Sequence, residues 1–346
     1  EYKKIKNIAL KKKLKIETIS NNKSSLKIVS HRYLHNTQLI EFKYKKKIYK
    51  FKTKLIGKIQ IKNILMAMLA AKKSGLDFRQ ITSVIKKVKP VNGRLELVGN
   101  IRNNSKVILD YAHTPDALEV CIKNLKEQFK NKKISIVFGC GGNRDKSKRP
   151  IMGKIANTYC DKIYITDDNP RNESPIKIRS AIKNKIDKIK VLEIADRSEA
   201  IKRAVLNLKT GDILIVAGKG HEDFQDYGKY KRLFSDKKEI LKNIKIKNKN
   251  LSNDIRLNIL KEISKSNNIN SNIKIRNVSI NSKDIKKNDV FFAIKGKKLD
   301  GNKYVNEALK KKSSLAIVNR INKDHPASKQ IKVKNTLSFL TKCSSI

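Results

Sequence analysis

The sequence predicts an α/β protein whose largest part is a parallel sheet with crossover helices. Two apolar, β-rich runs, Ile134 to Phe138 and Ile163 to Thr166, each end in a polar loop, with an amphipathic segment between them. This order is the β-loop-α-β-loop repeat of such a sheet. The repeat continues with expected helices over 177–188 and 197–208 and expected strands at VLEIA and GDILIVAG. After a polar segment the α/β pattern starts again, which predicts a second, smaller unit.

Length and composition allow two or three folded domains and exclude a membrane span. The chain has 346 residues, of which 39% are hydrophobic, so that cores can form. No run of 18 apolar residues occurs, and the first residues carry no signal-peptide pattern. The first residue is not Met, and we therefore expect the chain to be a fragment. The four cysteines show no CxxC or metal-ligand spacing, so a reduced, cytoplasmic setting is expected.

The net charge of +50 is the most unusual property of the sequence. A charge of this size favours nucleic acid as a partner. The excess is nearly all lysine, however, and it is spread from end to end beside many Ile and Asn residues, as in proteins encoded by AT-rich genomes. Aromatic residues make up 6% of the chain, and no RNP-like or zinc-finger pattern is present. Nucleic-acid binding is therefore the less favoured alternative.

The first part of the chain is predicted to be a small sheet followed by two helices. Residues 1–55 alternate short apolar runs with Lys-rich turns, which predicts antiparallel strands with one buried face. The period then becomes that of a helix, which we expect to end at Gly75, and a second helix is expected over 78–88. The buried face of the first helix is expected to consist of Ile61, Ile64, Leu65, Met68, Leu69 and Ala71.

A helix start follows the expected strand KVILDYAH. Thr114 is the expected N-cap, Pro115 the first helical residue, and Asp116 lies in the first turn. The beginning of a helix at the end of a strand can bind an anion. His113 lies beside it, either as a ligand contact or as an ordinary loop residue.

Four polar loops follow strands of the predicted sheet, and ligands of such sheets bind beyond the carboxyl ends of the strands. The loops are 110–113, 139–149, 166–171 and 217–222. Two of them carry charged and amide side chains, namely Arg144, Asp145, Lys146, Lys148, Arg149, Asp167, Asp168, Asn169 and Arg171. Guanidinium groups pair bidentately with carboxylates, so this edge suits a small molecule that carries carboxylates. The alternative is a Gly-rich turn beside a solvated charge cluster.

The last part of the chain is predicted to be a separate α/β unit of about 90 residues. Residues 243–254 have the composition of a linker. Beyond them we expect helices over 255–264 and 305–312, and strands within NIKIRNVSINS, DIKKNDVFFAIKG and SLAIVNR. The whole sequence contains no G-x-S-x-G elbow, which argues against a serine-hydrolase triad, and it contains no P-loop.

Five motifs in order, GRLE, DYAHTPDAL, FGCGGNRDKSKRPIMG, TDDNPR and AGKGHED, resemble those of the Mur ligase family. On these motifs, residues 1–245 are similar to the carboxyl-terminal part of the members that add 2,6-diaminopimelate to UDP-N-acetylmuramoyl-L-alanyl-D-glutamate. Residues 252–346 resemble the amino-terminal domain of the members that add D-alanyl-D-alanine. The resemblance implies the junction of a fused or tandem ligase pair. Its segments would be the end of the central ATP-binding domain (1–92), a Rossmann-like carboxyl-terminal domain (93–242), a linker (243–254) and the UDP-binding amino-terminal domain of a second ligase (255–346).

The resemblance also implies a site for the incoming amino acid. The residues matched to the diaminopimelate site are Arg144, Asn169, Arg171, Gly218 and Glu222. Their chemistry agrees with this role, since arginines can take carboxylates and Glu222 can take an ammonium group. Lys148 and Arg149 are interpreted as structural or steering charges. The competing interpretation of Arg171 is a surface salt bridge with Asp167 or Asp168.

Nucleotide-binding residues follow from the same resemblance. Those matched to ATP are Asn63, Arg94, Asp110 and His113. Gln60 stands where relatives often have Asn, which leaves its role open. In the last unit, Ser282 and Lys283 are matched to the UDP-sugar.

The implied reaction is ATP-dependent amide-bond formation in peptidoglycan precursor synthesis. ATP phosphorylates the D-glutamyl carboxylate, the amine of meso-diaminopimelate attacks the acyl phosphate, and Mg²⁺ bridges the phosphates. The family's P-loop and carbamylated lysine lie upstream of residue 1, so we expect no catalytic residue and no metal ligand in this chain, and little activity from it alone. We expect a monomer with small-molecule partners and no membrane contact. A non-catalytic remnant or binding module is the main alternative, while TDDNPR argues against the related folylpolyglutamate synthases.

Overall fold

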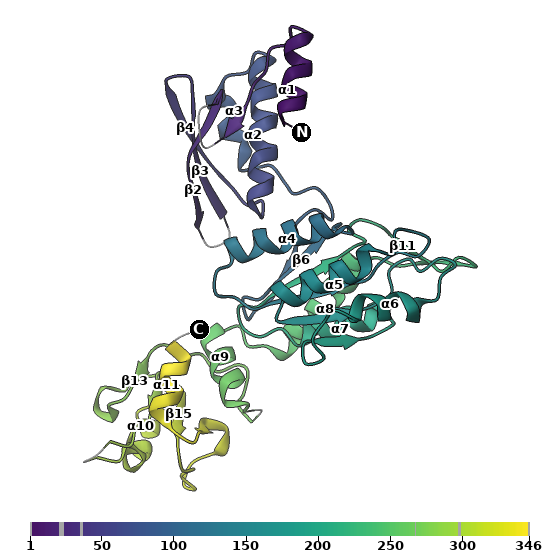
Figure 1. Ribbon diagram of the computed structural model, residues 1–346. Helices are drawn as coiled ribbons and strands as arrows, with labels where there is room; N and C mark the ends of the chain where they lie inside the picture. The colour runs from purple at the N-terminus through teal and green to yellow at the C-terminus, as the bar shows by residue number, and fades with distance from the viewer. Residues whose placement is uncertain (1, 21–23, 35–36, 267, 297–298, 345–346) are drawn as a thin grey trace.

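Three α/β units follow one another along the chain, each built on its own sheet (Figure 1). The computed structural model describes residues 2–20, 24–34, 37–266, 268–296 and 299–344. The predicted α/β class is confirmed, and the middle unit has the predicted parallel sheet.

The first unit packs helices against a sheet with the order β1-β2-β3-β4. Its elements are α1 (Tyr2–Lys11), β1 (Ile19–Ser20), β2 (Leu26–Leu34), β3 (Thr37–Tyr44), β4 (Lys47–Thr53), α2 (Lys58–Lys73) and α3 (Phe78–Ile85). The expected antiparallel strands are present as β2, β3 and β4, whereas β1 pairs in parallel with β2. The expectation of strands from the first residue onward is wrong. Residues 2–11 form a helix, in which Ile5 and Ile8 recur at helical spacing.

Helix α2 has the predicted buried face. Five of the six predicted residues are buried, namely Ile61, Ile64, Leu65, Met68 and Leu69. Ala71 is half-buried at the edge of the same cluster. Phe78 of α3 completes this core, with its ring 5.4 Å from that of Phe42. The helix ends as predicted, because Ser74 caps it and Gly75 follows with φ +100°.

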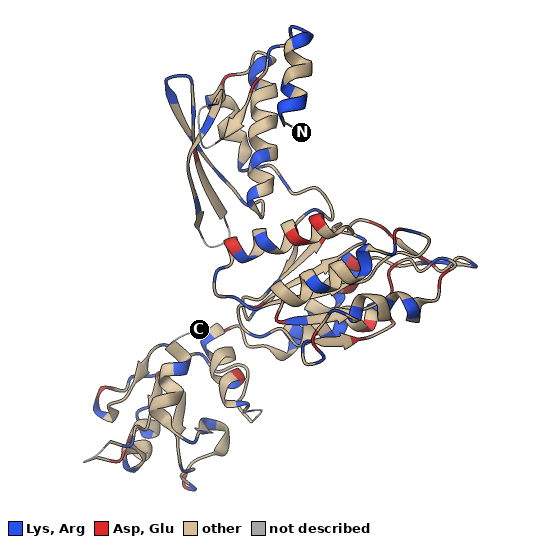
Figure 2. Ribbon diagram, viewed as in Figure 1, with Lys and Arg blue, Asp and Glu red and all other residues tan. Residues whose placement is uncertain are grey.

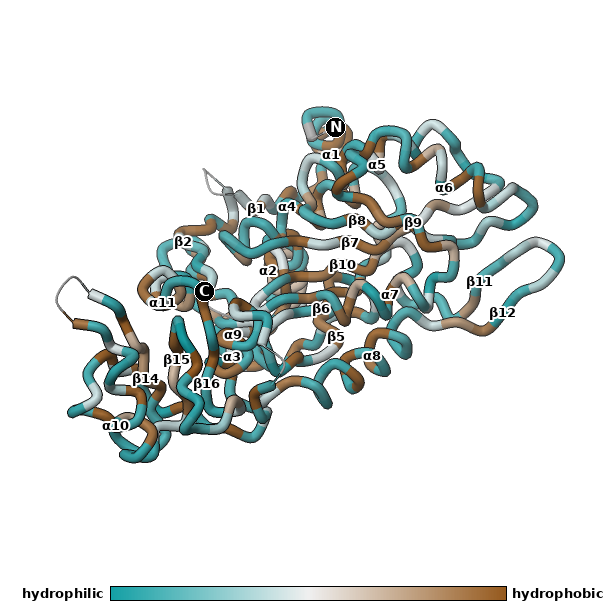
Figure 3. Tube along the Cα trace, turned by 90° about the horizontal axis from the view of Figure 1, so that it is seen from below, coloured by the Kyte–Doolittle hydropathy of each residue, from teal (hydrophilic) through white to brown (hydrophobic). Residues whose placement is uncertain are grey.

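The middle unit is a sheet with the order β5-β6-β10-β7-β8-β9 and helices on both faces. All strand pairs of this six-stranded sheet are parallel except β5 with β6. In Figure 3 the strands lie between α5 and α6 on one side and α7 and α8 on the other. The elements of this unit are β5 (Glu96–Asn100), β6 (Lys106–Asp110), α4 (Pro115–Gln128), β7 (Ile134–Phe138), α5 (Lys148–Tyr159), β8 (Lys162–Ile165), α6 (Pro175–Lys183), β9 (Val191–Glu193), α7 (Arg197–Leu206), β10 (Ile213–Ala217), β11 (Phe224–Asp226), β12 (Lys231–Leu233) and α8 (Asp236–Asn250).

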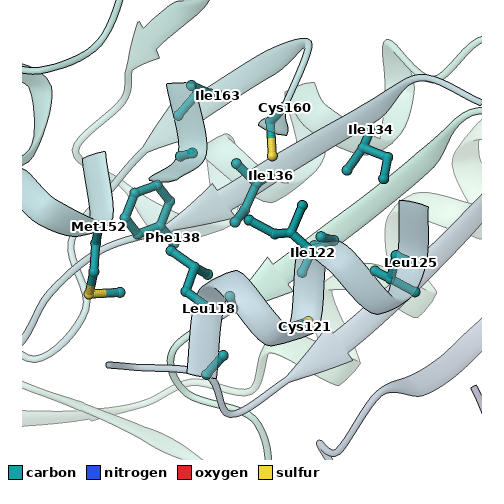
Figure 4. Close-up of a cluster of buried hydrophobic side chains, with 14 of the residues drawn as sticks. Leu118, Cys121, Ile122, Leu125, Ile134, Ile136, Phe138, Met152, Cys160 and Ile163 are labelled. Carbon is teal, nitrogen blue, oxygen red and sulfur yellow. The ribbon is translucent and has the colours of Figure 1, made fainter. Parts of the chain in front are cut away.

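Alternate residues of these strands point to opposite faces of the sheet, and each face has its own core. Ile213 and Ile215 of β10 join one cluster with α4, α5 and α6, while Leu214 and Val216 join the other with α7 and α8. Figure 4 shows the first cluster, in which the α4 side chain Ile122 lies against β7. Because both faces are covered, the strands are nearly continuous apolar runs.

Local signals in this unit predicted the elements well and their ends less well. The Thr114 hydroxyl accepts a hydrogen bond from the Ala117 amide at 3.4 Å and Pro115 opens α4, so the predicted helix start is confirmed. Helices α6 and α7 end at Lys183 and Leu206, before the predicted residues 188 and 208. The hairpin of β11 and β12 was not predicted.

The segment expected to be a linker, 243–254, is helical over most of its length, so that expectation is wrong up to residue 250. Its buried residues within α8 are Asn243, Ile244 and Lys247. Ile240 and Ile244, four residues apart, join the core beneath α7. This apolar spacing outweighs the Lys- and Asn-rich composition from which a linker was expected.

A buried ion pair joins helices α7 and α8. Arg197 and Asp236 are both fully buried. Arg197 Nε and Nη2 donate to the two Asp236 carboxylate oxygens at 2.7 and 2.8 Å, and Nη2 also donates to Ala217 O at 2.9 Å. The third nitrogen, Nη1, lies 4.0 Å from Asp168 Oδ2 and has no hydrogen-bond partner in the described part of the chain.

The last unit is a parallel sheet with the order β13-β14-β15-β16 and two cores of its own. Its elements are α9 (Ile255–Ser264), β13 (Val278–Ser279), η1 (Ser282–Asp284), β14 (Val290–Phe292), η2 (Gly301–Tyr304), α10 (Val305–Lys310), β15 (Leu315–Val318), η3 (Ala327–Lys329), β16 (Gln330–Lys332) and α11 (Thr336–Ser344). Helix α9 has the predicted bounds. The stretch NIKIRNVSINS is strand over 278–279 alone, and β16 and α11 were not predicted.

Side chains of the middle unit contact both neighbouring units. Gln128 and Asn124 of α4 accept from the amides of Gly57 and Ile59 at 2.8 and 3.1 Å, at the start of α2. On the other side, Thr210 donates its amide and hydroxyl to Glu262 Oε2 of α9 at 2.8 and 3.0 Å. Lysines and arginines are distributed over all three units rather than gathered on one (Figure 2).

We predict that Arg197→Met lowers the free energy of unfolding by about 3–5 kcal/mol, because Asp236 would remain buried without its partner. The control is Arg203→Met on the same helix, where the exposed pair with Glu199 at 2.8 Å should contribute at most about 1 kcal/mol. Urea denaturation followed by circular dichroism measures both. Equal losses in the two variants would contradict a buried, uncompensated carboxylate.

A second prediction concerns pH and Lys247. Its Nζ donates to Leu206 O at 2.7 Å, and burial lowers its pKa to about 8, although the nearby Glu262 and Asp212 carboxylates oppose this shift. The unfolded chain, with an ordinary lysine pKa of about 10.4, binds more protons between these two values. Lys247 therefore destabilises the fold below pH 8 by roughly 3 kcal/mol, and this penalty disappears as the pH rises toward 10. In urea titrations at pH 7 to 10, Lys247→Met should gain most at pH 7; parallel wild-type and variant curves would refute the prediction.

Candidate functional site

The predicted convergence of four strand ends at one edge of the middle sheet is confirmed. Strands β6, β7, β8 and β10 are parallel neighbours, and Ala217 at the end of β10 pairs with Asp110 at the end of β6. The loops after these strands approach closely. A Cβ on Gly139 would lie 2.3 Å from Thr166 O, so the loops after β7 and β8 touch.

A buried lysine lies at the centre of this edge of the sheet. Lys219 is fully buried, and its Nζ donates to Asn169 Oδ1 at 3.0 Å and to Glu222 Oε2 at 2.9 Å. Asn169 Nδ2 donates to the same Glu222 oxygen at 3.0 Å. The structure thus brings together Asn169 and Glu222, two residues predicted for the amino-acid site, through a residue that the sequence reasoning missed. The available signal was the position of this lysine, two residues after the all-apolar strand β10.

Glu222 is ionised in this network. Burial alone would raise the pKa of its carboxyl group, but the hydrogen bond and charge of Lys219, with the hydrogen bonds from Asn169 and Tyr111, hold that pKa below its ordinary value. The Tyr111 hydroxyl donates to the other oxygen, Oε1, at 3.4 Å. Glu222 therefore offers a negative charge at neutral pH.

The two predicted arginines lie on neighbouring loops. Arg171 has φ +51°, and its Nη1 donates to Gly142 O at 2.8 Å. Its Nε lies 3.8 Å from Asp226 Oδ2, so its acidic neighbour is Asp226 and neither of the two candidates Asp167 and Asp168. Arg144 is exposed and forms no ion pair within the described residues. Arg171 Nη1 and Arg144 Cγ lie 2.9 and 3.8 Å from the position that a Gly141 Cβ would take, which places both side chains around one glycine.

Gly218 is required by the shape of the site. Its φ of +110° disfavours any side chain, and a Cβ there would lie 2.7 Å from Asp168 Oδ2. Gly218 thus lets β10 pass close to the TDDNPR loop. Asp167 of that loop is bonded to Arg179 and to the Tyr227 hydroxyl at 3.3 Å, so each of its two oxygens has a partner within the protein.

Most of the other charges after β7 bind within the protein. Arg149 is buried and donates to Glu173 at 3.0 Å, and Lys148 donates to His113 O at 2.9 Å. Asp145 accepts from the Ser147 amide and hydroxyl at 2.8 and 2.6 Å. These geometries make Lys148 and Arg149 structural residues of the loop.

The residues predicted for ATP form a second group beside the first. Asn63 Nδ2 donates to Gln60 Oε1 at 3.4 Å, and Gln60 Nε2 donates to Arg94 O at 3.5 Å. The Arg94 guanidinium lies 4.7 Å from the centre of the Tyr111 ring and is exposed. The His113 ring contacts Tyr111 O through Nδ1 at 2.9 Å. Three stretches of the sequence, around residues 60, 94 and 111, therefore meet here.

Asp110 has a structural role in this arrangement. Its two oxygens accept the amides of Leu95 and Ala112 at 2.7 and 2.8 Å. Burial raises the pKa of this carboxyl group, against the effect of those two amides. Asp110 thus fixes the GRLE turn, where Leu95 has φ +45° and a Cβ on Gly93 would lie 2.6 Å from Gly220 C.

The residues predicted for the UDP-sugar follow β13 in the last unit. The Ser282 hydroxyl is buried and donates to Glu307 Oε2 at 2.7 Å. Lys283 is exposed, and its carbonyl accepts from Lys311 Nζ at 3.1 Å. These two residues are adjacent, but they lie in a different unit from the other predicted site residues.

The described residues contain neither a cluster of metal ligands nor a helix that could cross a membrane. No group of three or more His, Cys, Asp or Glu side chains there could hold a metal ion. No helix among them is both long enough and apolar enough to cross a membrane. The four cysteines are free thiols.

Comparison with known proteins assigns two parts of the chain to one family. Residues 93–220 match the family model described as "Mur ligase, glutamate ligase domain". Residues 274–339 match the model described as "Mur ligase family, catalytic domain". This second description differs from the amino-terminal, UDP-binding domain that the resemblance implied for that segment.

Curated relatives at 39–46% identity are UDP-N-acetylmuramoyl-L-alanyl-D-glutamate–2,6-diaminopimelate ligases. The ligase of Rickettsia felis is 44% identical over 213 residues, which are 61% of this chain and 39% of the relative. That of Chelativorans sp. is 39% identical over 238 residues, 69% of this chain and 49% of the relative. The chain thus spans less than half the length of these relatives.

Solved structures agree with this assignment. A solved structure of a UDP-N-acetylmuramoyl-L-alanyl-D-glutamate–2,6-diaminopimelate ligase is 32% identical, with a TM-score of 0.54, and the match covers 70% of this chain and 50% of that one. The UDP-N-acetylmuramate–alanine ligase of Thermotoga maritima, 18% identical with a TM-score of 0.51 over 66% of this chain and 48% of that one, shares the fold. Two parts of this chain, residues 93–220 and 274–339, are therefore Mur ligase family domains.

Proposed function

We propose that this chain supplies the acceptor amino-acid site of an ATP-dependent ligase that adds meso-diaminopimelate to UDP-N-acetylmuramoyl-L-alanyl-D-glutamate in peptidoglycan precursor synthesis. The observation that carries the proposal is the arrangement at the edge of the middle sheet. Cationic Arg144 and Arg171 surround Gly141, and ionised Glu222 is bonded to Asn169 in the loops beside them. The identity of 44% to a ligase with that name supports the choice of substrate.

The chemistry of the acceptor fits this set of groups. Diaminopimelate has an ammonium and a carboxylate at the end that does not react. A guanidinium pairs well with a carboxylate, and a carboxylate accepts from an ammonium. Arg144 is the better first contact, because it is exposed and without an ion pair among the described residues, whereas Arg171 already donates to Gly142 O at 2.8 Å. Arg171 then donates to the same carboxylate from the other side of Gly141.

The nucleotide would lie beside this site. The exposed Arg94 guanidinium suits a phosphate, and the Asn63 amide suits the base, so the residues present fit part of an ATP molecule. ATP would supply the phosphoryl group that activates the D-glutamyl carboxylate as an acyl phosphate, which the amine then attacks as phosphate leaves. Among the described residues, no group of three or more His, Cys, Asp or Glu side chains could hold the magnesium ion.

The last unit would serve a second ligase. We propose the domain bounds 1–92, 93–250 and 255–346; the end of the second domain moves from the expected residue 242 to 250 because α8 runs to Asn250 and packs on the middle sheet. In the third segment, Lys283 is exposed at the carboxyl edge of the sheet and suits a diphosphate, while Ser282 is already bonded to Glu307. Lys283 is therefore the stronger of the two candidates for a UDP-sugar.

Two alternatives give different observations. A non-catalytic remnant would keep the fold but show no selectivity between amino acids. A nucleic-acid-binding protein would bind DNA with a steep salt dependence. The spread of lysines over all three units gives no preference for a single nucleic-acid groove (Figure 2).

We predict that the chain binds meso-diaminopimelate with a Kd between about 1 µM and 1 mM, the usual range for enzyme substrates. L-Lysine, which lacks the distal carboxylate, should bind at least about 100-fold more weakly, because the arginines would be left without their partner. Isothermal titration calorimetry measures both ligands.

The same titrations should assign the arginines. Arg171→Met and Arg144→Met should each weaken diaminopimelate binding by about 10-fold or more while changing lysine binding little. Lys146→Met is the control. This exposed lysine lies in the same loop as Arg144, and its Nζ is 3.9 Å from Glu173 of the loop after β8. Unchanged selectivity in both arginine variants, or equal binding of the two amino acids by the wild type, would refute the proposed function.

A further inference from the structure

The Lys219 side chain has no assigned part in the site, although it lies at its centre. It is fully buried, whereas lysines are almost never buried without a partner. An ammonium group removed from water is costly unless its donors are bonded to acceptors, preferably charged ones. Two such acceptors are present, Glu222 Oε2 at 2.9 Å and Asn169 Oδ1 at 3.0 Å. The Phe224 ring lies 5.6 Å from the same nitrogen and adds a cation–π contact.

These bonds fix the direction of the Asn169 amide. Its oxygen accepts from Lys219 Nζ and from the Asp226 amide at 3.0 Å, and its nitrogen donates to Glu222 Oε2 at 3.0 Å. A flipped amide would place its NH₂ group against the ammonium and its oxygen against the carboxylate. Both contacts would be repulsive, so Lys219 and Glu222 together allow one orientation.

The same bonds divide the Glu222 carboxylate into two unlike oxygens. Oε2 accepts from both Lys219 and Asn169 at 2.9 and 3.0 Å. Oε1 has one contact within the described residues, from the Tyr111 hydroxyl at 3.4 Å, which is long for such a bond. An oxygen of an ionised carboxylate has room for more than one donor. Oε1 is therefore the acceptor that a ligand can use.

We propose that Lys219 is a positioning residue, whose ammonium holds Glu222 Oε2 and the Asn169 amide in place so that Glu222 Oε1 receives the cationic group of the substrate. This inference rests on the proposed function for the identity of that substrate, an amino acid with a free ammonium at its distal end. Lys219 itself does not touch the substrate. Its effect is to keep the carboxylate charged and to present one defined oxygen.

Two other charged groups, Arg197 and Asp168, lie near this network. Arg197 Nη1 lies 4.0 Å from Asp168 Oδ2, behind the loop, and its charge also favours ionised Glu222. Asp168 lies under Gly218 and opposes that effect. Both groups remain in a Lys219 variant, so a change seen in the variant reports the lysine.

The test is nuclear magnetic resonance on the whole chain, without ligand, with ¹³C-labelled glutamate and ¹⁵N-labelled lysine. In the wild type, the Lys219 Nζ resonance should move in step with the titration of Glu222, which should occur below the ordinary pKa of a glutamate side chain. In Lys219→Met, the Glu222 midpoint should rise by at least one pH unit. The matched control is Lys202→Met, which removes a lysine paired at the same three-residue spacing, to exposed Glu199 at 3.1 Å; it should leave Glu222 unchanged.

A second readout adds the substrate. The affinity for meso-diaminopimelate is measured from pH 4 to 8. As the pH falls, this affinity should be lost at a pH at least one unit higher in Lys219→Met than in the wild type. If the lysine were purely structural, its replacement would lower the affinity by the same factor at every pH. If the wild type fails to bind diaminopimelate but the Glu222 midpoint moves as stated, the proposed function fails and the positioning role stands. A Glu222 midpoint that is equal in wild type and variant overturns the positioning role. Should Lys219→Met not fold, the wild-type titration decides, and a Lys219 resonance that ignores Glu222 overturns the proposal.

Discussion

Strand β10 lies between β6 and β7, and this placement is the constraint on which the site depends. Because β10 pairs in parallel with both neighbours, the polar loops after all three strands leave the sheet at one edge. The register matters as much as the order. Side chains alternate between the two faces, so a slip of one residue would exchange the two cores and would take Lys219 away from its partners. The two buried faces therefore hold the charged edge in place.

The buried and the exposed charges of this protein are stabilised in different ways. The chain carries a net charge of +50, yet the buried cations near the site each have an acidic partner. Arg149 pairs with Glu173 at 3.0 Å, Arg197 with Asp236 at 2.7 Å and Lys219 with Glu222 at 2.9 Å. A buried charge without a partner would cost several kcal/mol, whereas exposed lysines are hydrated and screened by salt. The net charge thus says little about the site, whose chemistry is set by these local pairs.

The sequence predicted what depends on short-range patterns. Strand β7 and helix α9 have the predicted bounds, since the apolar run of the strand and the apolar spacing of the helix are local signals. It failed where distant partners decide the outcome. Arg197 and Asp236 are 39 residues apart, and Lys219 is 50 residues from Asn169, so no local pattern shows which groups these side chains pair with. Helix α8 was missed for the opposite reason, because its Lys- and Asn-rich outer face hid two isoleucines that pack inward.

The central claim is that these loops form the site for one end of an amino acid with two charged ends. The most direct measurement is a crystal structure of the chain with meso-diaminopimelate. The account predicts the distal carboxylate within hydrogen-bond distance of Arg144 and Arg171, and the distal ammonium on Glu222 Oε1 with Lys219 still on Oε2. Diaminopimelate bound elsewhere, or bound with its ammonium toward the arginines, would contradict the account.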